Sequence, residues 1–271
     1  MRKQINFMSM KLYHYTSVDV LELILKNRTI KFNRLDQVDD LNEKEFTSGL
    51  IGTQLGLYTF AACFSKSSKE SIPMWNMYAK WNSGVRIGIM KDMFNNYKHY
   101  LDAGFVKGPL ETIIADKSEI LGKDYIVAPV PLSEMYVEVI YTDDSQKLIS
   151  KAIPTDGKSF KFPEIGKYKI TEWDFQYEIK FRIHVFPLDM SLIGKGADEE
   201  IIFKPMRENR EISKTCFYVP LKDIAIDNME IMIGPNASCE DRERIVELAK
   251  EYCTNATIIN SKLTGMIRTK I

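Results

Sequence analysis

The sequence predicts a single α+β domain over residues 1–271, with a mixed or antiparallel central sheet flanked by helices. Short apolar runs with the length of strands alternate along the chain with segments that have the 3.6-residue period of amphipathic helices. No internal repeat, low-complexity tract or Gly/Ser/Pro-rich linker divides the chain. With 271 residues and 45% apolar content, the chain buries enough surface for a core without a metal ion or disulfide.

The N-terminal half contains the clearest predicted elements. Strands are expected at 12–15, 29–32, 57–64 and 85–90, because each is a short apolar run bounded by turn-forming residues. Ser17 offers an N-cap for a helix over 18–26, and a further helix is expected after the acidic turn 36–43. Pro73 suits the first turn of another helix, which would place on one face Met74, Trp75, Met77, Tyr78 and Trp81.

The apolar pattern of the C-terminal half is less regular, so its elements are less clearly defined. One or two helices are expected within 92–132, and a helix with an exposed loop within the Lys-rich segment 143–169. Strands are expected at 136–141, 177–186, 201–204, 216–219, 230–233 and 257–260. The strand 177–186 would carry Glu178, Lys180, Arg182 and His184 on one face. Ser238 can cap a last helix that runs to about Cys253.

Composition and charge exclude several classes of protein. The 37 basic residues balance the 37 acidic ones, so net charge draws the chain neither to nucleic acid nor to anionic lipid. The four cysteines form no CxxC pair, so their spacing does not match that of a zinc site. This spacing favours free thiols that pack as small apolar side chains. The basic N-terminus lacks an apolar core of signal-peptide length, and no apolar run reaches membrane-spanning length. We therefore expect a cytoplasmic protein with no membrane partner.

A small set of polar and aromatic residues within apolar elements could carry chemistry. His14, in the first strand, could bind a ribose or act in acid–base catalysis, or could be a core histidine bonded to a backbone carbonyl. Trp75 and Tyr78 belong to an aromatic helix face that could stack on a base or could pack in the core. Ser65 could line a polar site or could form the turn after its strand.

The strand 177–186 and the acidic turn contain the candidate carboxylates. Glu178, with Gln176 in phase and Arg182 on the same face, could be a catalytic group or part of a salt-bridge ladder across strands. The acidic turn could bind a divalent cation or could be a solvated turn that caps a helix; its candidate ligands are Asp39, Asp40 and Glu43. Nucleotide-binding glycine motifs, HExxH and GxSxG are absent, and three histidines make a histidine-rich metal site improbable.

Six segments, taken in order, resemble the bacterial domain-of-unknown-function family 2971. They are YHYTS, VDDLNE, CFSKS, MWNMYAKWNSGVRIGI, W-x3-YEIKFRI and MEIMIGPNAS, and the resemblance as a whole extends over about residues 12–261. The resemblance implies one domain of this type over residues 1–271. Val38 and Leu41 depart from the Phe and Pro usual in the family's acidic turn, and Lys180 stands where a second Glu is common.

The order of these parts is similar, more distantly, to the ADP-ribosyltransferase-like folds. This resemblance implies that His14 holds the ribose on the adenosine side of NAD and that Tyr78 stacks on the nicotinamide. It also implies that Glu178 stabilises the oxocarbenium-like transition state, with Gln176 facing the acceptor. The leading hypothesis is an NAD-consuming transferase that needs no cofactor, of the kind found among bacterial defence or toxin-type effectors.

Two other hypotheses remain open at this point. A non-catalytic module that binds a ligand or nucleic acid in stress or phage response would use the Lys-rich segments 147–169 and 204–214. A metal-dependent nuclease or hydrolase would bring the acidic turn and Glu178 together around a cation. The acceptor and the oligomeric state are outside what the residues indicate.

Overall fold

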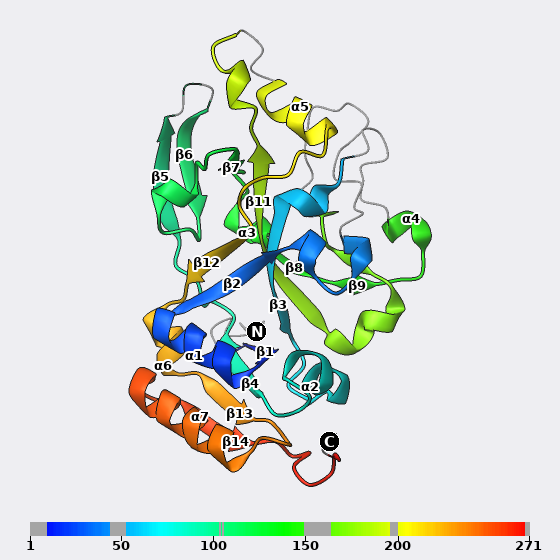
Figure 1. The fold of residues 1–271 in the computed structure, drawn as a ribbon, viewed down its shortest axis with the longest axis vertical. Helices are drawn as coiled ribbons and strands as arrows, with labels where there is room; N and C mark the ends of the chain where they lie inside the picture. The colour runs from blue at the N-terminus through cyan, green and yellow to red at the C-terminus, as the bar shows by residue number, and fades with distance from the viewer. Residues whose placement is uncertain are drawn as a thin grey trace, which may run out of the picture.

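The computed structural model describes residues 10–43, 53–102, 104, 106–148, 164–195 and 200–268. Within these residues a ten-stranded sheet forms the centre of the molecule (Figure 1). Its strands are β1 (Lys11–Thr16), β2 (Thr29–Arg34), β3 (Thr59–Ser65), β4 (Val85–Met90), β7 (Tyr125–Val127), β8 (Tyr136–Glu138), β11 (Glu178–Pro187), β12 (Cys216–Pro220), β13 (Glu230–Ile233) and β14 (Thr257–Asn260).

The sheet runs in the order β12-β2-β3-β1-β4-β13-β14, and β11 joins it by pairing with β3, β7 and β8. Its neighbouring strands are antiparallel except for β13 and β14, which are parallel. Two small ribbons lie outside it: an antiparallel hairpin of β5 (Tyr97–Asp102) and β6 (Lys107–Thr112), and a parallel pair of β9 (Ile140–Tyr141) and β10 (Tyr168–Lys169). The mixed, mostly antiparallel α+β fold expected from the sequence is confirmed.

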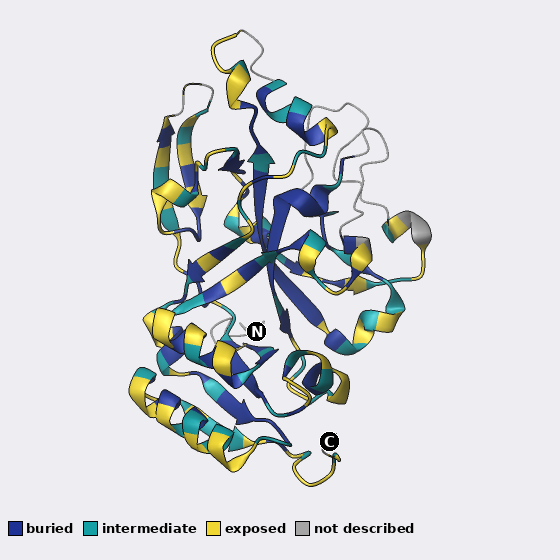
Figure 2. Cartoon of the chain, viewed as in Figure 1, coloured by how far each residue is buried: buried dark blue, intermediate teal, exposed yellow. Residues whose placement is uncertain are grey.

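The helices surround this sheet. They are α1 (Val18–Asn27), α2 (Ile72–Tyr78), α3 (Leu132–Met135), α4 (Ser145–Leu148), α5 (Glu200–Arg207), α6 (Asp223–Asp227) and α7 (Cys239–Tyr252). Both predicted serine caps are confirmed: Ser17 Oγ accepts from the Val20 amide at 3.2 Å, and Ser238 Oγ accepts from the Asp241 amide at 3.0 Å. α1 and α7 pack against each other, and each turns an exposed face to solvent (Figure 2).

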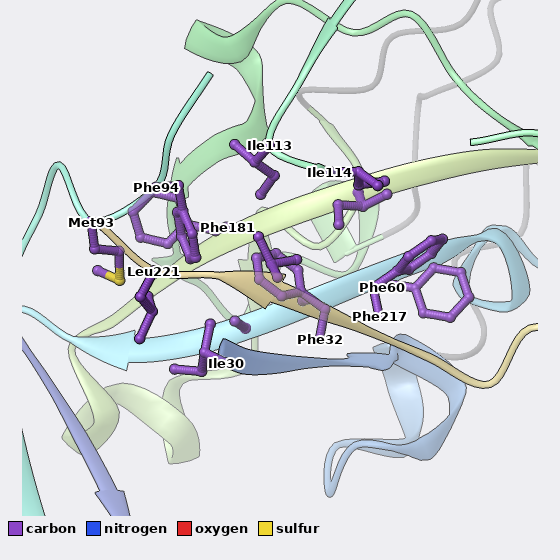
Figure 3. Close-up of a cluster of buried hydrophobic side chains, with 14 of the residues drawn as sticks. Ile30, Phe32, Phe60, Met93, Phe94, Ile113, Ile114, Phe181, Phe217 and Leu221 are labelled. Atoms are coloured by element: carbon purple, nitrogen blue, oxygen red, sulfur yellow. The ribbon is translucent and has the colours of Figure 1, made fainter. Parts of the chain in front are cut away.

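One hydrophobic cluster extends from β1 to the end of α7. At its centre Phe181 of β11 packs edge-on against Phe64 at 5.8 Å and Phe94 at 5.1 Å between ring centroids. Phe60 meets Phe217 of β12 in the same edge-to-face way, at 4.8 Å. Figure 3 shows Phe60 and Phe217 side by side, and Phe181 close to Phe94. Such rings remove large apolar areas from water, so this face of β11 holds the sheet in place.

Three predictions about local structure are wrong. Residues 97–112, expected to be partly helical, form the β5–β6 hairpin, in which exposed residues alternate with more buried ones. Residues 201–204, expected to be a strand, lie inside α5, because a short apolar run does not distinguish a strand from one face of a helix. The predicted strand 136–141 is divided at Val139 into β8 and β9, which pair with different partners.

The helix that carries Trp75 and Tyr78 also ends earlier than predicted. α2 stops at Tyr78, and Ala79 follows as its C-cap. Residues 80–82, none of which is glycine, then all adopt the left-handed conformation, with φ of 46°, 56° and 71°. Trp81 therefore leaves the helix face on which its spacing placed it, and 62% of its surface is exposed.

The polar face of β11 is buried, contrary to the interpretation as a surface ladder. Glu178, Lys180, Arg182 and His184 are each at most 5% exposed. The segment that carries β10 covers this face: Lys169 bonds Glu178, and Gly166 O accepts from Lys180 Nζ. The helix expected after the acidic turn, and most of the loop within 143–169, lie outside the described residues.

Among the described residues, no helix combines the length and the apolar character needed to cross a bilayer. Cys63, Cys216, Cys239 and Cys253 are free thiols.

Candidate functional site

A cavity of about 300 Å³ opens where β1 and β3 separate. These two strands pair only at Tyr13 opposite Ser65. β1 pairs along its whole length with β4, while β3 pairs with β11 and, near its start, with β2. The cavity is lined by parts of β1, β2, β3, α2, the acidic turn, β10 and the start of β11. Its volume is at the lower end of the range for small-molecule sites.

Four residues named from the sequence line this cavity: His14, Tyr78, Gln176 and Glu178. The acidic turn contributes Asp39, Asp40 and Glu43 to the same lining. The antiparallel register explains how Glu178 arrives there, since it lies opposite Ser65 at the end of β3 where β1 departs. Residues far apart in the chain are thus collected at one point of strand divergence.

Gln176 reaches the cavity by a different route from the one predicted. It ends a 3-10 helix at Thr171–Gln176, and Tyr177 then turns left-handed with φ of 46° before β11 begins at Glu178. Gln176 and Glu178 therefore do not alternate along one strand face. The Glu178 amide donates to Tyr141 Oη at 2.8 Å, which fixes the first residue of β11.

Two lysines and two glutamates form a buried charge cluster in the cavity wall. Lys169 Nζ lies 2.7 Å from Glu178 Oε2 and 2.7 Å from Glu43 Oε1. Lys180 Nζ lies 2.6 Å from Glu43 Oε2 and 4.0 Å from Glu178 Oε2. The side chains of all four are at most 6% exposed. Buried charges are tolerated only when paired in this way, and this cluster contains equal numbers of both signs.

The cluster keeps Glu178 ionised. Burial alone raises the pKa of a carboxyl group, but the charges of Lys180 and Lys169 outweigh it and hold the pKa of Glu178 below its ordinary value. Burial opposes the charged form of Lys169 as well, yet Glu43 and Glu178 raise its pKa well above the usual range. Both groups are therefore charged at neutral pH. The wall presents a fixed negative oxygen in a poorly solvated place.

A chain of hydrogen bonds runs from this cluster toward the surface. Lys169 Nζ donates to Gln176 Oε1 at 3.1 Å, and Gln176 Nε2 donates to Tyr78 Oη at 2.8 Å. The carboxylate of Asp39, an exposed lining residue, lies near the Tyr78 hydroxyl. Burial, together with the nearby Asp39 charge, raises the pKa of Tyr78 and keeps its hydroxyl protonated. Tyr78 therefore serves the site with its polar end as well as its ring.

His14 is neutral and has a defined tautomer. Its Nδ1 lies 2.9 Å from the Cys63 carbonyl oxygen, which can only accept, so Nδ1 carries the proton. Burial lowers the pKa of His14, although the bond to Cys63 partly opposes this. Its ring packs on Phe64 at 5.5 Å between centroids. Nε2 is then an acceptor, which suits a ribose hydroxyl better than a phosphate.

The structure places three predicted site residues outside the cavity lining. Ser65 accepts from the Ser67 amide at 3.2 Å and shapes the turn after β3. Trp75 is fully buried, with its indole N–H donating to Glu70 at 3.1 Å. Arg182 is buried behind the cluster, where it donates to the carbonyls of Ile165 and Glu134, and burial lowers its pKa to about 10.

Sequence reasoning missed Lys169 and Lys31. Lys169 lies in a polar, Lys-rich segment that reads as exposed loop, and nothing local marks it as buried. Lys31 is an exposed residue of β2 that lines the cavity and supplies a positive charge beside it. Lys31 lies between the apolar residues Ile30 and Phe32. Because successive side chains of a strand point to opposite faces, this pattern could have shown that Lys31 faces away from the core.

The geometry does not favour a cation site at the acidic turn. In the part of the chain that the structure describes, no group of three or more His, Cys, Asp or Glu residues is arranged to hold a metal ion. Lys169 and Lys180 already neutralise Glu43 and Glu178 at salt-bridge distance.

Comparisons with protein-family models, with curated proteins and with solved structures find no match to this chain. The functional argument therefore depends on the chemistry of the cavity.

Proposed function

We propose that this cavity binds the nicotinamide–ribose half of NAD and that the protein is an NAD-consuming enzyme of the ADP-ribosyltransferase type. The observation that carries the proposal is that His14, Tyr78, Gln176 and Glu178 line one cavity. We propose on the six sequence segments that the chain belongs to the domain-of-unknown-function family 2971.

The proposed reaction breaks the bond between the nicotinamide nitrogen and ribose C1′. The bonding electron pair leaves with nicotinamide, which departs as a neutral molecule, and positive charge develops on C1′ and the ring oxygen. An acceptor, either water or a nucleophilic group of a second molecule, then bonds to C1′ and loses a proton. A fixed carboxylate near the developing charge lowers the energy of this transition state.

Glu178 suits that role because it is buried and ionised at neutral pH. Lys169 at 2.7 Å holds the carboxylate in place and also offsets part of its negative potential. Tyr78 provides an aromatic ring for nicotinamide. His14 Nε2, which the resemblance assigns to the adenosine-side ribose, provides in this cavity an acceptor for a hydroxyl of the nicotinamide ribose. Lys31 lies beside the cavity, where it could meet a phosphate group.

The test is turnover by Glu178→Gln. This variant keeps the shape of the side chain and removes its charge, so we expect kcat for NAD to fall by roughly two to three decades while KM changes little. Nicotinamide release is measured with purified protein, and label transfer is measured with labelled NAD and cell lysate. The matched control is Glu230→Gln, another strand glutamate paired with a lysine, Lys11 at 2.9 Å, outside the cavity lining.

Urea denaturation of both variants separates lost catalysis from lost folding. Loss of turnover by folded Glu178→Gln, with turnover retained in Glu230→Gln, supports the proposal. A wild type that binds NAD but releases no nicotinamide, with acceptors supplied, contradicts the enzymatic proposal and favours a ligand-binding module.

A further inference from the structure

A second depression of about 300 Å³ lies on the outer side of the cavity wall. It is lined by Asp39, Asn76, Met77, Lys80 and Trp81. Asp39 also lines the main cavity, so the two spaces share a wall. We call the second space the Trp81 groove.

The exposure of Trp81 is imposed by a strained and well-anchored turn. Lys80, Trp81 and Asn82 are consecutive non-glycine residues with positive φ, a conformation that costs free energy at each position. Buried Asn82 anchors the turn: its amide donates to the Trp75 carbonyl at 3.1 Å, and its Nδ2 donates to Asn76 Oδ1 at 2.7 Å. The large ring is thus held at the surface, with 62% of its area exposed, by a rigid backbone.

The remaining lining residues offer a mixed environment. Met77 is 46% exposed and adds apolar surface beside the indole. Lys80 is exposed and positively charged, and Asp39 is exposed, with a side chain whose oxygens can accept hydrogen bonds. A planar heterocycle with a phosphate at one end and donor groups on its sugar or base matches these three features. Base–aromatic stacking of this kind contributes substantially to nucleotide binding.

We propose that the Trp81 groove binds the adenosine half of the same NAD molecule, with adenine stacked on Trp81. This inference rests on the proposed function, because it assigns the second half of the substrate. Asp39 lines both spaces and forms their common wall, so a dinucleotide that crosses it reaches both. Lys80 contacts the phosphates, and Asp39 accepts from the adenosine ribose.

The experiment compares two substrates that differ only in the adenosine half. In Trp81→Ala, KM for NAD rises roughly tenfold or more while kcat stays within about twofold, because stacking contributes to binding alone. Turnover of nicotinamide mononucleotide, which lacks the adenosine half, is unchanged. Trp81→Phe keeps an aromatic ring and recovers most of the affinity for NAD.

The control is Tyr100→Ala on the β5–β6 hairpin. Tyr100 is 55% exposed, and Figure 1 shows the hairpin at the opposite end of the molecule from α2. This variant keeps the wild-type KM for NAD. Equal increases in KM for both substrates in Trp81→Ala would overturn the subsite, because they would indicate damage to the main cavity.

Calorimetric titration with AMP decides the inference without any turnover. The groove predicts that wild type binds AMP and that Trp81→Ala binds it roughly tenfold or more weakly. If NAD is not consumed but this pattern holds, the proposed function fails and the adenosine subsite stands. If AMP does not bind, or binds Trp81→Ala as tightly as wild type, the subsite is refuted whatever the enzyme does.

Discussion

Lys169→Met removes the cation that two buried carboxylates share. Lys169 is 6% exposed at its side chain and lies 2.7 Å from both Glu43 and Glu178. Methionine fills a similar volume, and among the residues that the structure describes Glu178 then keeps Lys180, at 4.0 Å, as its paired cation. Breaking a buried ion pair on one side costs about 3–5 kcal/mol, because the remaining charge stays desolvated. We expect a loss of about 3 kcal/mol or more at pH 7, since Glu43 keeps Lys180 as a close partner.

The loss should depend on pH in a definite direction. In wild type the folded-state pKa of Glu178 is lowered, so its stabilising contribution is present above its ordinary value of 4.5 and disappears as the pH falls through the folded-state pKa. Without Lys169, burial raises the folded-state pKa of Glu178 above its unfolded value. As the pH falls, the folded variant therefore takes up a proton at Glu178 before the unfolded chain does, and this stabilises the variant. The difference in free energy of unfolding between the two proteins therefore becomes smaller from pH 8 to pH 5.

Urea denaturation followed by circular dichroism measures these free energies. Lys98→Met is the matched control: Lys98 and Glu111 form an ion pair at 3.1 Å, but 76% and 51% of their side chains are exposed. We expect no measurable loss there, because exposed pairs are screened by solvent. Adding Glu178→Gln to Lys169→Met should restore about 1–3 kcal/mol, as coupled neighbours do. A loss below about 1 kcal/mol, or one that does not change with pH, would refute the description of this cluster as desolvated.

Two further predictions concern stability away from the cavity. His184 is 2% exposed, and burial, with the charge of Arg182, lowers its pKa well below 6.5. The unfolded chain therefore gains a proton that the folded protein does not, so stability falls as the pH drops below 6.5, by up to about 1.4 kcal/mol per pH unit. His184→Gln should flatten this slope in urea titrations at pH 7 and 5.5, and an unchanged slope would assign it to other groups. Ser238→Ala should cost about 1 kcal/mol in thermal melts by removing the acceptor for the Asp241 amide, whereas Ser238→Asp should restore most of it.

Local signals predicted the elements that depend on neighbours in the chain. The strands β1, β2, β12, β13 and β14 and the helices α1 and α7 are found where apolar period and serine caps placed them. Each depends on contacts within a few residues, such as Ser17 with the Val20 amide. The failures at 97–112 and 201–204 are short segments in which period and propensity fit two structures equally well.

The candidate site was predictable only in part. His14, Tyr78, Gln176 and Glu178 were named from the sequence, and they line one cavity. Lys169 was missed because burial of a lysine in a polar segment has no local signature. Trp81 was assigned to the helix because its spacing fits, although the left-handed turn that removes it depends on Asn82 bonding to Trp75 and Asn76.

Local patterns in the sequence were enough to predict the α+β class, most of the strands and the serine caps, and to name four of the residues that line the cavity. The burial of the charged face of β11, and the contact of Lys180 with Glu43 137 positions away in the chain, depend on the fold as a whole. The physical reason is the sequence separation of the interacting residues. Hydrogen bonds that cap a helix join residues a few positions apart. The pairing of buried charges depends instead on strand register and on which segments cover the sheet. The divergence of β1 from β3 is of the second kind, and it creates the cavity.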